Sequence, residues 1–404
     1  MAANEKNPEK AKPAAMFWPL MKDTVNAEDR KSLSDFVLTS ERLTNGPKVR
    51  EFEETWSRWQ GAPQSLFVSS GSTANYLLLA AVMERYGIEP GSKVAVPAVT
   101  WSTNIAPVIQ CGLEPVFCDV SRSHFGIETE DLKKAAKKHG DIKIVFVTHL
   151  FGIPAPVHEY REVLPDAVFL EDVCESHGTQ VGGEKAGNLS EGSTFSFYFG
   201  HHMTTVEGGM VCSRDGHLHE IMRAKRSHGL ARERGAEGFE RFRNRYPEVD
   251  KEFLFSTGGF NFRNTEIGAV LGLSQIKRLD KFIERRREIF GRFTKMTWEK
   301  RPDLFSSFDT EGNSSYCLPF VCKTREMRGK MQKYMTENGV ETRPLCGGNM
   351  LRQPFLEGRY GNPSDFPNAD CLHFQGFFIG NNHLITDGET EKLEQLIDSF
   401  VKKL

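Results

Sequence analysis

Short runs of β-branched and aromatic residues alternate with longer amphipathic stretches from about residue 20 to residue 290. This alternation is typical of βαβ units, in which helices cover both faces of a mainly parallel sheet. It therefore predicts an α/β fold for most of the chain. Six of the runs are predicted strands: KVAVPAV (93–99), PVFCDV (115–120), IKIVFVTHL (142–150), AVFLEDV (167–173), TFSFYF (194–199) and GGMVCS (208–213).

Three helices are predicted between and after these strands. Residues 73–87 form one, with Ser72 or Thr73 as its N-cap, and residues 129–140 form another that ends at Gly140, a natural C-cap. Residues 269–293 predict a single long amphipathic helix with many basic side chains on its polar face. We expect that face to be solvated or to form a strut between two lobes.

The chain divides into three predicted parts. Residues 1–20 form a disordered tail, because residues 1–15 are rich in Lys, Glu, Pro and Ala and lack the apolar core of a signal peptide. Residues 21–290 form the large α/β domain. Residues 291–404, with the segment SSYCLPFVCK (314–323) and a closing helix, form a smaller α+β domain.

Charge and cysteine usage exclude several kinds of partner. The 52 basic and 54 acidic side chains nearly cancel, so no overall field would hold a nucleic acid or an anionic membrane. No run of 18 or more apolar residues suggests a membrane span. The eight cysteines form no CxxC pair and most lie in apolar runs, which indicates reduced thiols and a cytoplasmic protein.

The motif SSGSTAN (69–75) places Gly71, Ser72 and Thr73 where a strand turns into a helix. Free backbone N–H groups and the positive end of the helix dipole at such a turn favour an anion, and a phosphate would fit. Small residues also open helices simply as caps, so this motif alone does not decide between the two readings.

Two further features follow predicted strands. Asp172, next to Glu171, ends the strand AVFLEDV, and a buried carboxylate at the carboxyl edge of a parallel sheet needs a cationic or hydrogen-bonding partner. A protonated pyridine nitrogen is such a partner, although Asp172 could instead cap the next loop. Trp101 follows the strand KVAVPAV and could stack on a flat heteroaromatic ring or belong to the core.

Taken together, these motifs resemble the DegT/DnrJ/EryC1/StrS sugar aminotransferase family, whose members use pyridoxal 5′-phosphate and act on nucleotide-linked 4-keto sugars. The resemblance covers nearly the whole chain beyond the tail. It implies the fold type I aminotransferase architecture, with a mainly parallel seven-stranded sheet, and a homodimer whose active sites lie between the subunits. The matching segments are LTNGPKVREFE (43–53), SSGSTAN (69–75), VPAVTW (96–101), PVFCDV (115–120), LEDVCESHG (170–178), FSF (195–197), VEGG (206–209), GGFNFRNTE (258–266) and ETRPL (341–345).

The resemblance also implies roles for single residues. Asp172 would pair with the pyridine nitrogen of the cofactor, Trp101 would stack on its ring, and Gly71, Ser72, Thr73 and Ser196 would surround its phosphate. Glu175 would lie near the ring hydroxyl, and Asn261 would reach the phosphate of the neighbouring subunit's cofactor. Arg343 is a candidate for binding a carboxylate or a sugar diphosphate, because its planar fork suits both groups; a surface salt bridge is the alternative.

One position departs from the family's pattern. A lysine normally stands six residues before the Glu of the EGG element and binds the cofactor covalently, whereas counting back from Glu207 leads to His201. An imidazole cannot form that bond, so the cofactor would be held noncovalently and would act as pyridoxamine 5′-phosphate. A histidine can still move protons near neutral pH.

With histidine in place of lysine, the chain resembles one branch of the family. The enzymes of that branch remove the C3 hydroxyl group from nucleotide-linked 4-keto-6-deoxy sugars. That likeness implies a dehydratase with His201 as its catalytic base and glutamate as its amino donor. The product enamine would tautomerise and hydrolyse to a 3,6-dideoxy-4-keto sugar and ammonia. Relatives with an iron–sulfur cluster carry cysteines close after the histidine, but here no cysteine lies between Cys212 and Cys317, so no cluster is expected.

Three alternatives remain open at this point. The chain could be an aminotransferase that routes its proton transfer through His201, or a binding protein that has lost catalysis together with the lysine. A metal site at His177, His201 and His202 is the third, but their spacing follows no ligand pattern, so no metal is expected.

Overall fold

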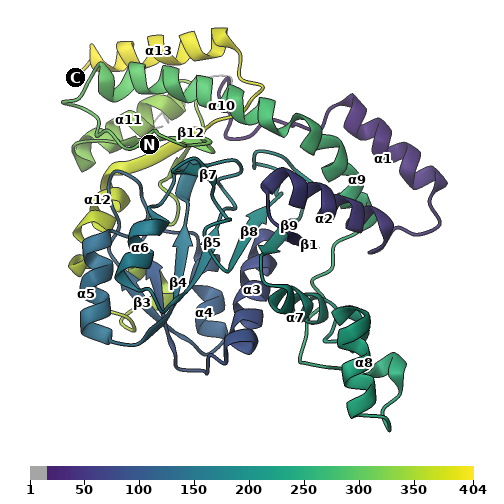
Figure 1. The fold of residues 1–404 in the computed structure, drawn as a ribbon. Coiled ribbons are helices and arrows are strands. Elements are labelled where there is room, and N and C mark those ends of the chain that lie inside the picture. Colours follow the sequence, from purple (N-terminus) through teal and green to yellow (C-terminus); the bar gives the residue numbers. More distant parts are fainter. Residues whose placement is uncertain (1–15) are drawn as a thin grey trace, which may run out of the picture.

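The computed structural model describes residues 16–404, and its centre is a seven-stranded sheet in the order β1-β9-β8-β5-β4-β2-β3 (Figure 1). Only β9 runs antiparallel to its neighbours. The predicted α/β class and all six predicted strands are confirmed. The sheet also contains β1, which was not predicted and which lies directly before the turn at residues 69–71. The strands are β1 Gln64–Val68, β2 Lys93–Pro97, β3 Glu114–Cys118, β4 Ile142–Thr148, β5 Val168–Asp172, β8 Gly192–Ser196 and β9 Gly209–Ser213.

Helices cover both faces of this sheet, which explains why its strands are apolar along their whole length. Along β2, Val94 and Val96 pack in the cluster that contains α3, and Ala95 points to the opposite face, where α5 and α6 lie. The α-helices between residues 16 and 294 are α1 Ala27–Thr39, α2 Pro47–Gln60, α3 Gly71–Tyr86, α4 Ala106–Gln110, α5 Thr129–His139, α6 Val157–Val163, α7 Gly216–Arg226, α8 Gly235–Arg245, α9 Glu266–Gln275 and α10 Leu279–Thr294.

Two helix predictions need correction, and one is confirmed. Gly140 does end α5, with a φ of 70°. The N-cap of α3 is Ser70, not Ser72 or Thr73, because the helix begins two residues earlier than predicted, at Gly71. The predicted helix 269–293 is two helices joined by a 3-10 segment, Ile276–Arg278. Its first part, in α9, is buried nearly all round, whereas α10 buries one stripe, so the two halves face different surroundings.

A smaller antiparallel sheet, in the order β10-β12-β11, lies in the C-terminal part of the chain, as the predicted α+β domain requires. The predicted boundary at residue 290 falls within α10 and stays a prediction. The elements here are β10 Cys317–Val321, α11 Arg325–Glu337, β11 Thr342–Pro344, α12 Pro367–Gln375, β12 Gly376–Gly380 and α13 Asp387–Val401, and a separate ribbon joins β6 Gln180–Val181 to β7 Glu184–Lys185.

The end of the predicted tail is ordered against this smaller sheet. Trp18 is buried, forms a parallel bridge with Val340, and donates its indole N–H to the Gly380 carbonyl at 2.8 Å. Residues 16–20 are therefore part of the fold, because an apolar indole gains more by burial than by solvation. The remainder of the predicted tail, residues 1–15, lies outside the described residues.

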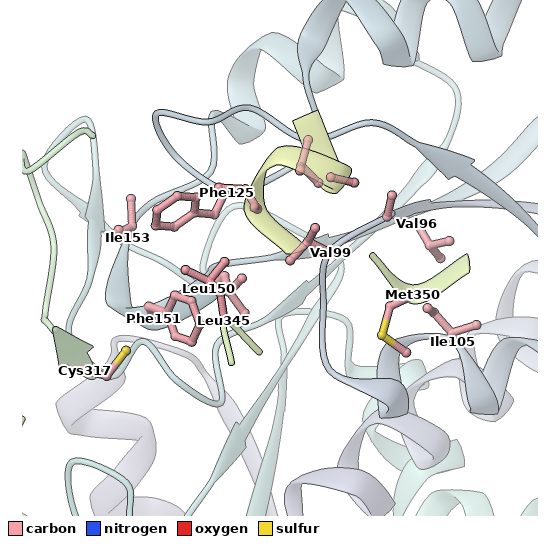
Figure 2. Close-up of a cluster of buried hydrophobic side chains, with 14 of the residues drawn as sticks. Val96, Val99, Ile105, Phe125, Leu150, Phe151, Ile153, Cys317, Leu345 and Met350 are labelled. Atoms are coloured by element: carbon pink, nitrogen blue, oxygen red, sulfur yellow. The ribbon is translucent and has the colours of Figure 1, made fainter. Parts of the chain in front are cut away.

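A buried apolar cluster joins the two sheets at the carboxyl ends of the large one. Figure 2 shows Leu150 and Phe151, which follow β4, beside Leu345 and near Cys317 of the C-terminal part. Val99 and Met350 continue the cluster. The two parts are thus packed directly beside the edge at which open α/β sheets bind ligands. Among the helices of residues 16–404, none has the length and apolar character needed to cross a membrane.

Candidate active site

A cavity of about 480 Å³ lies at the carboxyl ends of the large sheet's strands, with the smaller sheet as its opposite wall. All the predicted site residues line it except Thr73 and Asn261. The eight that do are Gly71, Ser72, Trp101, Asp172, Glu175, Ser196, His201 and Arg343. The strand-end motifs, which are far apart in the sequence, therefore converge on one space.

The N-terminus of α3 forms one wall of the cavity. Ser70 and Thr73 make a capping box, in which the Ser70 hydroxyl accepts from the Thr73 N–H at 3.1 Å and the Thr73 hydroxyl accepts from the Ser70 N–H at 3.0 Å. The side chain of Thr73 is thus used within the cap. The N–H groups of Gly71 and Ser72 have no partner within the helix and are available to an anion in the cavity.

Gly71 allows this helix terminus to approach the end of β8. A Cβ atom at Gly71 would lie 2.7 Å from the Ser196 Cβ and 3.0 Å from the Cys174 Sγ. These separations leave no room for a side chain. The absence of one at residue 71 brings the buried Ser196 beside the free N–H groups, which completes a cradle suited to a phosphate.

Asp172 is a buried carboxylate that faces the cavity. Its oxygens accept hydrogen bonds from the side-chain amides of Asn75 at 2.7 Å and Asn104 at 2.8 Å, and from the Cys174 N–H at 2.9 Å. Within residues 16–404 no basic side chain forms an ion pair with it. The site therefore holds a fixed, oriented negative charge whose cation has to come from a ligand.

Glu171 points to the other face of β5, because successive side chains of a strand alternate. It is fully buried, pairs with the Nε2 atom of His149 at 3.0 Å, and accepts from the Gly187 and Leu189 N–H groups. Glu171 thus stabilises the turn before β8, and Asp172 alone serves the cavity.

Trp101 stands at the mouth of the cavity with 56% of its surface exposed. It is therefore not a core residue, which was one of the two readings of its sequence position. An indole at the mouth can cover a flat ring bound below it.

His201 belongs to the loop that connects β8 to β9. The loop is closed by hydrogen bonds between the Phe197 N–H and the Gly208 carbonyl at 2.9 Å, and between the Thr205 N–H and the Phe197 carbonyl at 3.0 Å. The Gln275 side chain of α9 also accepts from the Thr204 N–H at 3.0 Å. This anchored loop holds the imidazole in the cavity wall with only 8% of its surface exposed.

The surroundings of His201 keep its imidazole neutral. Burial and the positive charge of Arg286 together lower the pKa of His201 to about 3, against a smaller opposing effect of the Cys174 backbone. Its ring lies 5.2 Å from that of Tyr316 and 6.2 Å from that of Tyr198, measured between centroids. A neutral imidazole at the edge of a cavity can accept a proton from a bound ligand.

The two neighbouring histidines are turned into the protein. His202 is fully buried, and its Nε2 atom lies 3.0 Å from the Ser314 carbonyl. His177 is also fully buried, with its ring 5.4 Å from Trp56 and 5.3 Å from His202. Within the described part of the chain, no group of three or more His, Cys, Asp or Glu side chains is placed to hold a metal ion.

Glu175 lies deeper in the cavity, where its Oε2 atom accepts from the Phe151 N–H at 3.1 Å. Burial raises the pKa of Glu175 to about 8, and the nearby Asp172 adds to the rise. Glu175 is consequently protonated over much of the neutral range and can donate a hydrogen bond, for example to a ring hydroxyl group.

The remaining predicted residues lie at the margins. Arg343, on β11, lines the cavity with about half of its side chain exposed and pairs with Glu341 at 2.8 Å. Asn261 is exposed outside this cavity, in a bridge with Ser227, and accepts from the Arg263 Nε–H at 3.1 Å. Its predicted role belongs to a neighbouring subunit's site and stays a prediction.

Several residues that shape the site were missed by the sequence reasoning. Asn75 and Asn104 orient Asp172, and Tyr316, the residue before β10, packs on His201. Asn75 alone had a sequence signal, because it is an amide on the otherwise apolar inner face of α3. No lysine of residues 16–404 lines the cavity.

Comparisons with known proteins agree with this geometry. The model of the DegT/DnrJ/EryC1/StrS aminotransferase family matches residues 24–399. The GDP-4-keto-6-deoxy-D-mannose 3-dehydratase of Yersinia pseudotuberculosis is 28% identical over 390 residues, which cover 94% of this chain and 98% of the relative.

Two solved structures of GDP-4-keto-6-deoxymannose 3-dehydratase are also similar. One is a mutant with bound GDP-perosamine, and the other holds a trapped PLP-glutamate geminal diamine. Each has a TM-score of 0.84 and 28% identity, and each alignment covers 94% of this chain and 100% of the solved one.

Proposed function

The chain belongs to the DegT/DnrJ/EryC1/StrS aminotransferase family, and from that premise we propose that it is a 3-dehydratase of a nucleotide-linked 4-keto-6-deoxy sugar. Pyridoxal 5′-phosphate and its amine form, pyridoxamine 5′-phosphate, are the proposed cofactor, and glutamate is the proposed amino donor. The similarity to dehydratases with bound GDP-perosamine and with a PLP-glutamate adduct supports each part of this assignment.

A single observation carries the proposal: a neutral imidazole, His201, stands in a cavity that no lysine of the described residues lines. Without a lysine amine, the cofactor stays a diffusible ligand and its own amino group is free to react. A lysine-dependent aminotransferase would need an amine in this wall, which is why the dehydratase is favoured over the aminotransferase.

The residues present fit the cofactor. Asp172 offers an oriented carboxylate without a basic partner, which suits the protonated nitrogen of a pyridine ring. The free N–H groups of Gly71 and Ser72, with Ser196 beside them, suit its phosphate. Trp101 at the mouth can cover its ring, and Glu175 can donate to its hydroxyl group.

When bound, the cofactor supplies an amine that condenses with the C4 ketone of the sugar and a conjugated ring that spreads negative charge. With the cofactor bound, His201 would take the proton from C4′ and could return it to the departing C3 hydroxyl group, which would leave as water. Asp172 would stabilise the positively charged ring nitrogen. The buried position of His201 limits the access of water to the proton being moved.

The partners follow from the same premise. Arg343 is proposed to bind an anionic group of the substrate, either the diphosphate or the carboxylate of glutamate, because its guanidinium is half exposed at the cavity. A homodimer would bring the partner's copy of this chain to the open side, with Asn261 as the residue contributed. A cytoplasmic location agrees with soluble nucleotide-sugar substrates.

The test is to incubate the protein with pyridoxal 5′-phosphate, glutamate and a panel of nucleotide-linked 4-keto-6-deoxy sugars, and to follow nitrogen and oxygen by mass spectrometry. Release of ammonia with a sugar that lacks its C3 oxygen is expected. A sugar that keeps the nitrogen would identify an aminotransferase instead. His201→Ala should abolish turnover, whereas His217→Ala, at an exposed histidine of α7, should leave it unchanged.

A further inference from the structure

Arg286 is a buried cation next to the β8–β9 loop, which carries His201 and is called the base loop below. The polar face of α10 was expected to be solvated or to act as a strut, but Arg286 is fully buried. Its guanidinium donates to the carbonyl oxygens of Asn381 at 2.5 Å, Tyr316 at 2.9 Å and His201 at 3.3 Å. No carboxylate of residues 16–404 forms an ion pair with it.

The three carbonyls belong to three different segments. His201 lies on the β8–β9 loop, Tyr316 directly precedes β10, and Asn381 directly follows β12. The Asn381 side-chain amide donates back to the Arg286 carbonyl at 3.0 Å and to the Ser315 hydroxyl at 2.8 Å. Arg286 therefore ties the base loop to the segments that flank the smaller sheet.

A purely structural anchor would not need a charge. Carbonyl groups are equally satisfied by neutral amide donors, and a buried cation without a counter-ion is costly. The positive charge, however, has a specific effect on a nearby imidazole, since it opposes the addition of a second positive charge. The geometry thus couples one side chain to both the position and the protonation of His201.

The other groups that face His201 do not replace this effect. The ring of His177, from the loop after β5, stacks on His201, and His202, the next residue of the same loop as His201, packs on His177. Burial lowers the pKa of His177 and of His202 well below the ordinary value. Burial raises the pKa of Tyr316 well above its ordinary value, so its hydroxyl group is neutral at physiological pH. In the cavity wall, Cys174 and Glu175 are held protonated by burial, which raises the pKa of both.

We propose that Arg286 is the positioning residue of the catalytic base: its guanidinium fixes the His201 backbone, and its positive charge adds to burial in holding the His201 imidazole in the neutral form. This inference rests on the proposed function, in which His201 is the base. Arg286 touches neither substrate nor cofactor in this role, because it is fully buried and its guanidinium donates to the backbone carbonyls of His201, Tyr316 and Asn381.

The experiment is a pH titration of the histidine side chains by NMR, in protein loaded with pyridoxamine 5′-phosphate. The His201 signal is assigned by its loss in His201→Asn. In the unsubstituted protein and in Arg286→Lys, which keeps the charge, we expect His201 to stay neutral to below pH 5. In Arg286→Gln, its midpoint should rise by about one pH unit or more.

Arg287→Gln is the matched control. Arg287 is the next residue of α10 and also donates to two carbonyls, those of Asn313 at 2.6 Å and Gly178 at 3.0 Å, but it has no contact with the base loop. This variant should leave the His201 midpoint unchanged. Equal midpoints in Arg286→Gln and the unsubstituted protein, or an equal shift in Arg287→Gln, would overturn the inference.

The titration requires no turnover, so it separates this inference from the proposed function. If His201 shifts but no sugar loses its C3 oxygen, Arg286 controls His201 and the proposed reaction is wrong. If deoxygenation occurs without the shift, Arg286 has no such role. Should Arg286→Gln fail to fold, the unsubstituted protein still decides, because a His201 midpoint near the ordinary value of about 6.5 contradicts the inference.

Discussion

The Asn75 side-chain amide donates to the Asp172 carboxylate at 2.7 Å, so that the inner face of α3 orients the charge at the end of β5. Asn75 is itself oriented, because its Oδ1 atom accepts from the Thr194 hydroxyl on β8 at 2.5 Å. Helix and sheet are thereby connected through the residue proposed to bind the cofactor's ring nitrogen.

Replacing Asn75 should therefore weaken cofactor binding. In Asn75→Leu the carboxylate of Asp172 loses one buried hydrogen bond, worth about 1–3 kcal/mol for a charged acceptor. We expect the affinity for pyridoxamine 5′-phosphate, measured by equilibrium dialysis, to fall about tenfold or more. Asn188→Leu removes a comparable amide, which donates to Gln60 far from the cavity, and should leave the affinity unchanged. Equal affinities in both variants would count against the proposed role of Asp172.

Trp101→Ala should weaken the same ligand without destabilising the protein. More than half of the Trp101 surface is already exposed, so little burial is lost when the ring is removed. Stacking on the cofactor, worth about 1 kcal/mol, is lost in the complex. Fluorescence titration and thermal denaturation measure the two effects. A large fall in melting temperature with unchanged affinity would show that Trp101 is a packing residue.

His201→Lys should restore a covalent bond to the cofactor. The side chain at residue 201 lines the cavity, so a lysine amine there can reach the aldehyde of pyridoxal 5′-phosphate. Borohydride reduction followed by peptide mass spectrometry should find the cofactor attached at residue 201. The unsubstituted protein, treated alike, is the control. Labelling at other lysines alone would mean that residue 201 is not in the position of the family's lysine.

Glu175→Gln should change the pH dependence of stability in the protein without cofactor. The Glu175 carboxyl has a pKa of about 8 when folded and about 4.5 when unfolded. The folded state therefore loses stability as the pH rises from about 4.5 to 8, since the unfolded chain ionises first. Glutamine keeps the acceptor for the Phe151 N–H and does not ionise. Urea denaturation should give the variant a stability advantage of about 1 kcal/mol or more at pH 8 and a smaller one at pH 5. The same difference at both pH values would contradict this account.

The local sequence pattern was sufficient to predict those elements of the fold whose structure depends on a single segment of the chain. The apolar runs predict the strands, because each is buried on both faces whatever its neighbours are. Gly140 predicts the end of α5, because a left-handed φ is a local requirement. The helix predicted over residues 269–293 was wrong for the converse reason: the break at Ile276–Arg278 depends on which surfaces α9 and α10 bury, and a single amphipathic pattern does not contain that information.

The sequence by itself determined which chemical groups are available: a strand-end Asp172, a strand-to-helix turn at Gly71 and Ser72, and a histidine six residues before Glu207, where the family has a lysine. The tertiary structure decided how those groups behave. Glu171 faces away from the cavity, Asn75 orients Asp172, and Arg286 lies buried against His201. Each of these features depends on contacts between residues 16 to 97 positions apart in the sequence. Burial and charge act through space, so the neutral state of His201 is set by packing and not by the order of residues along the chain.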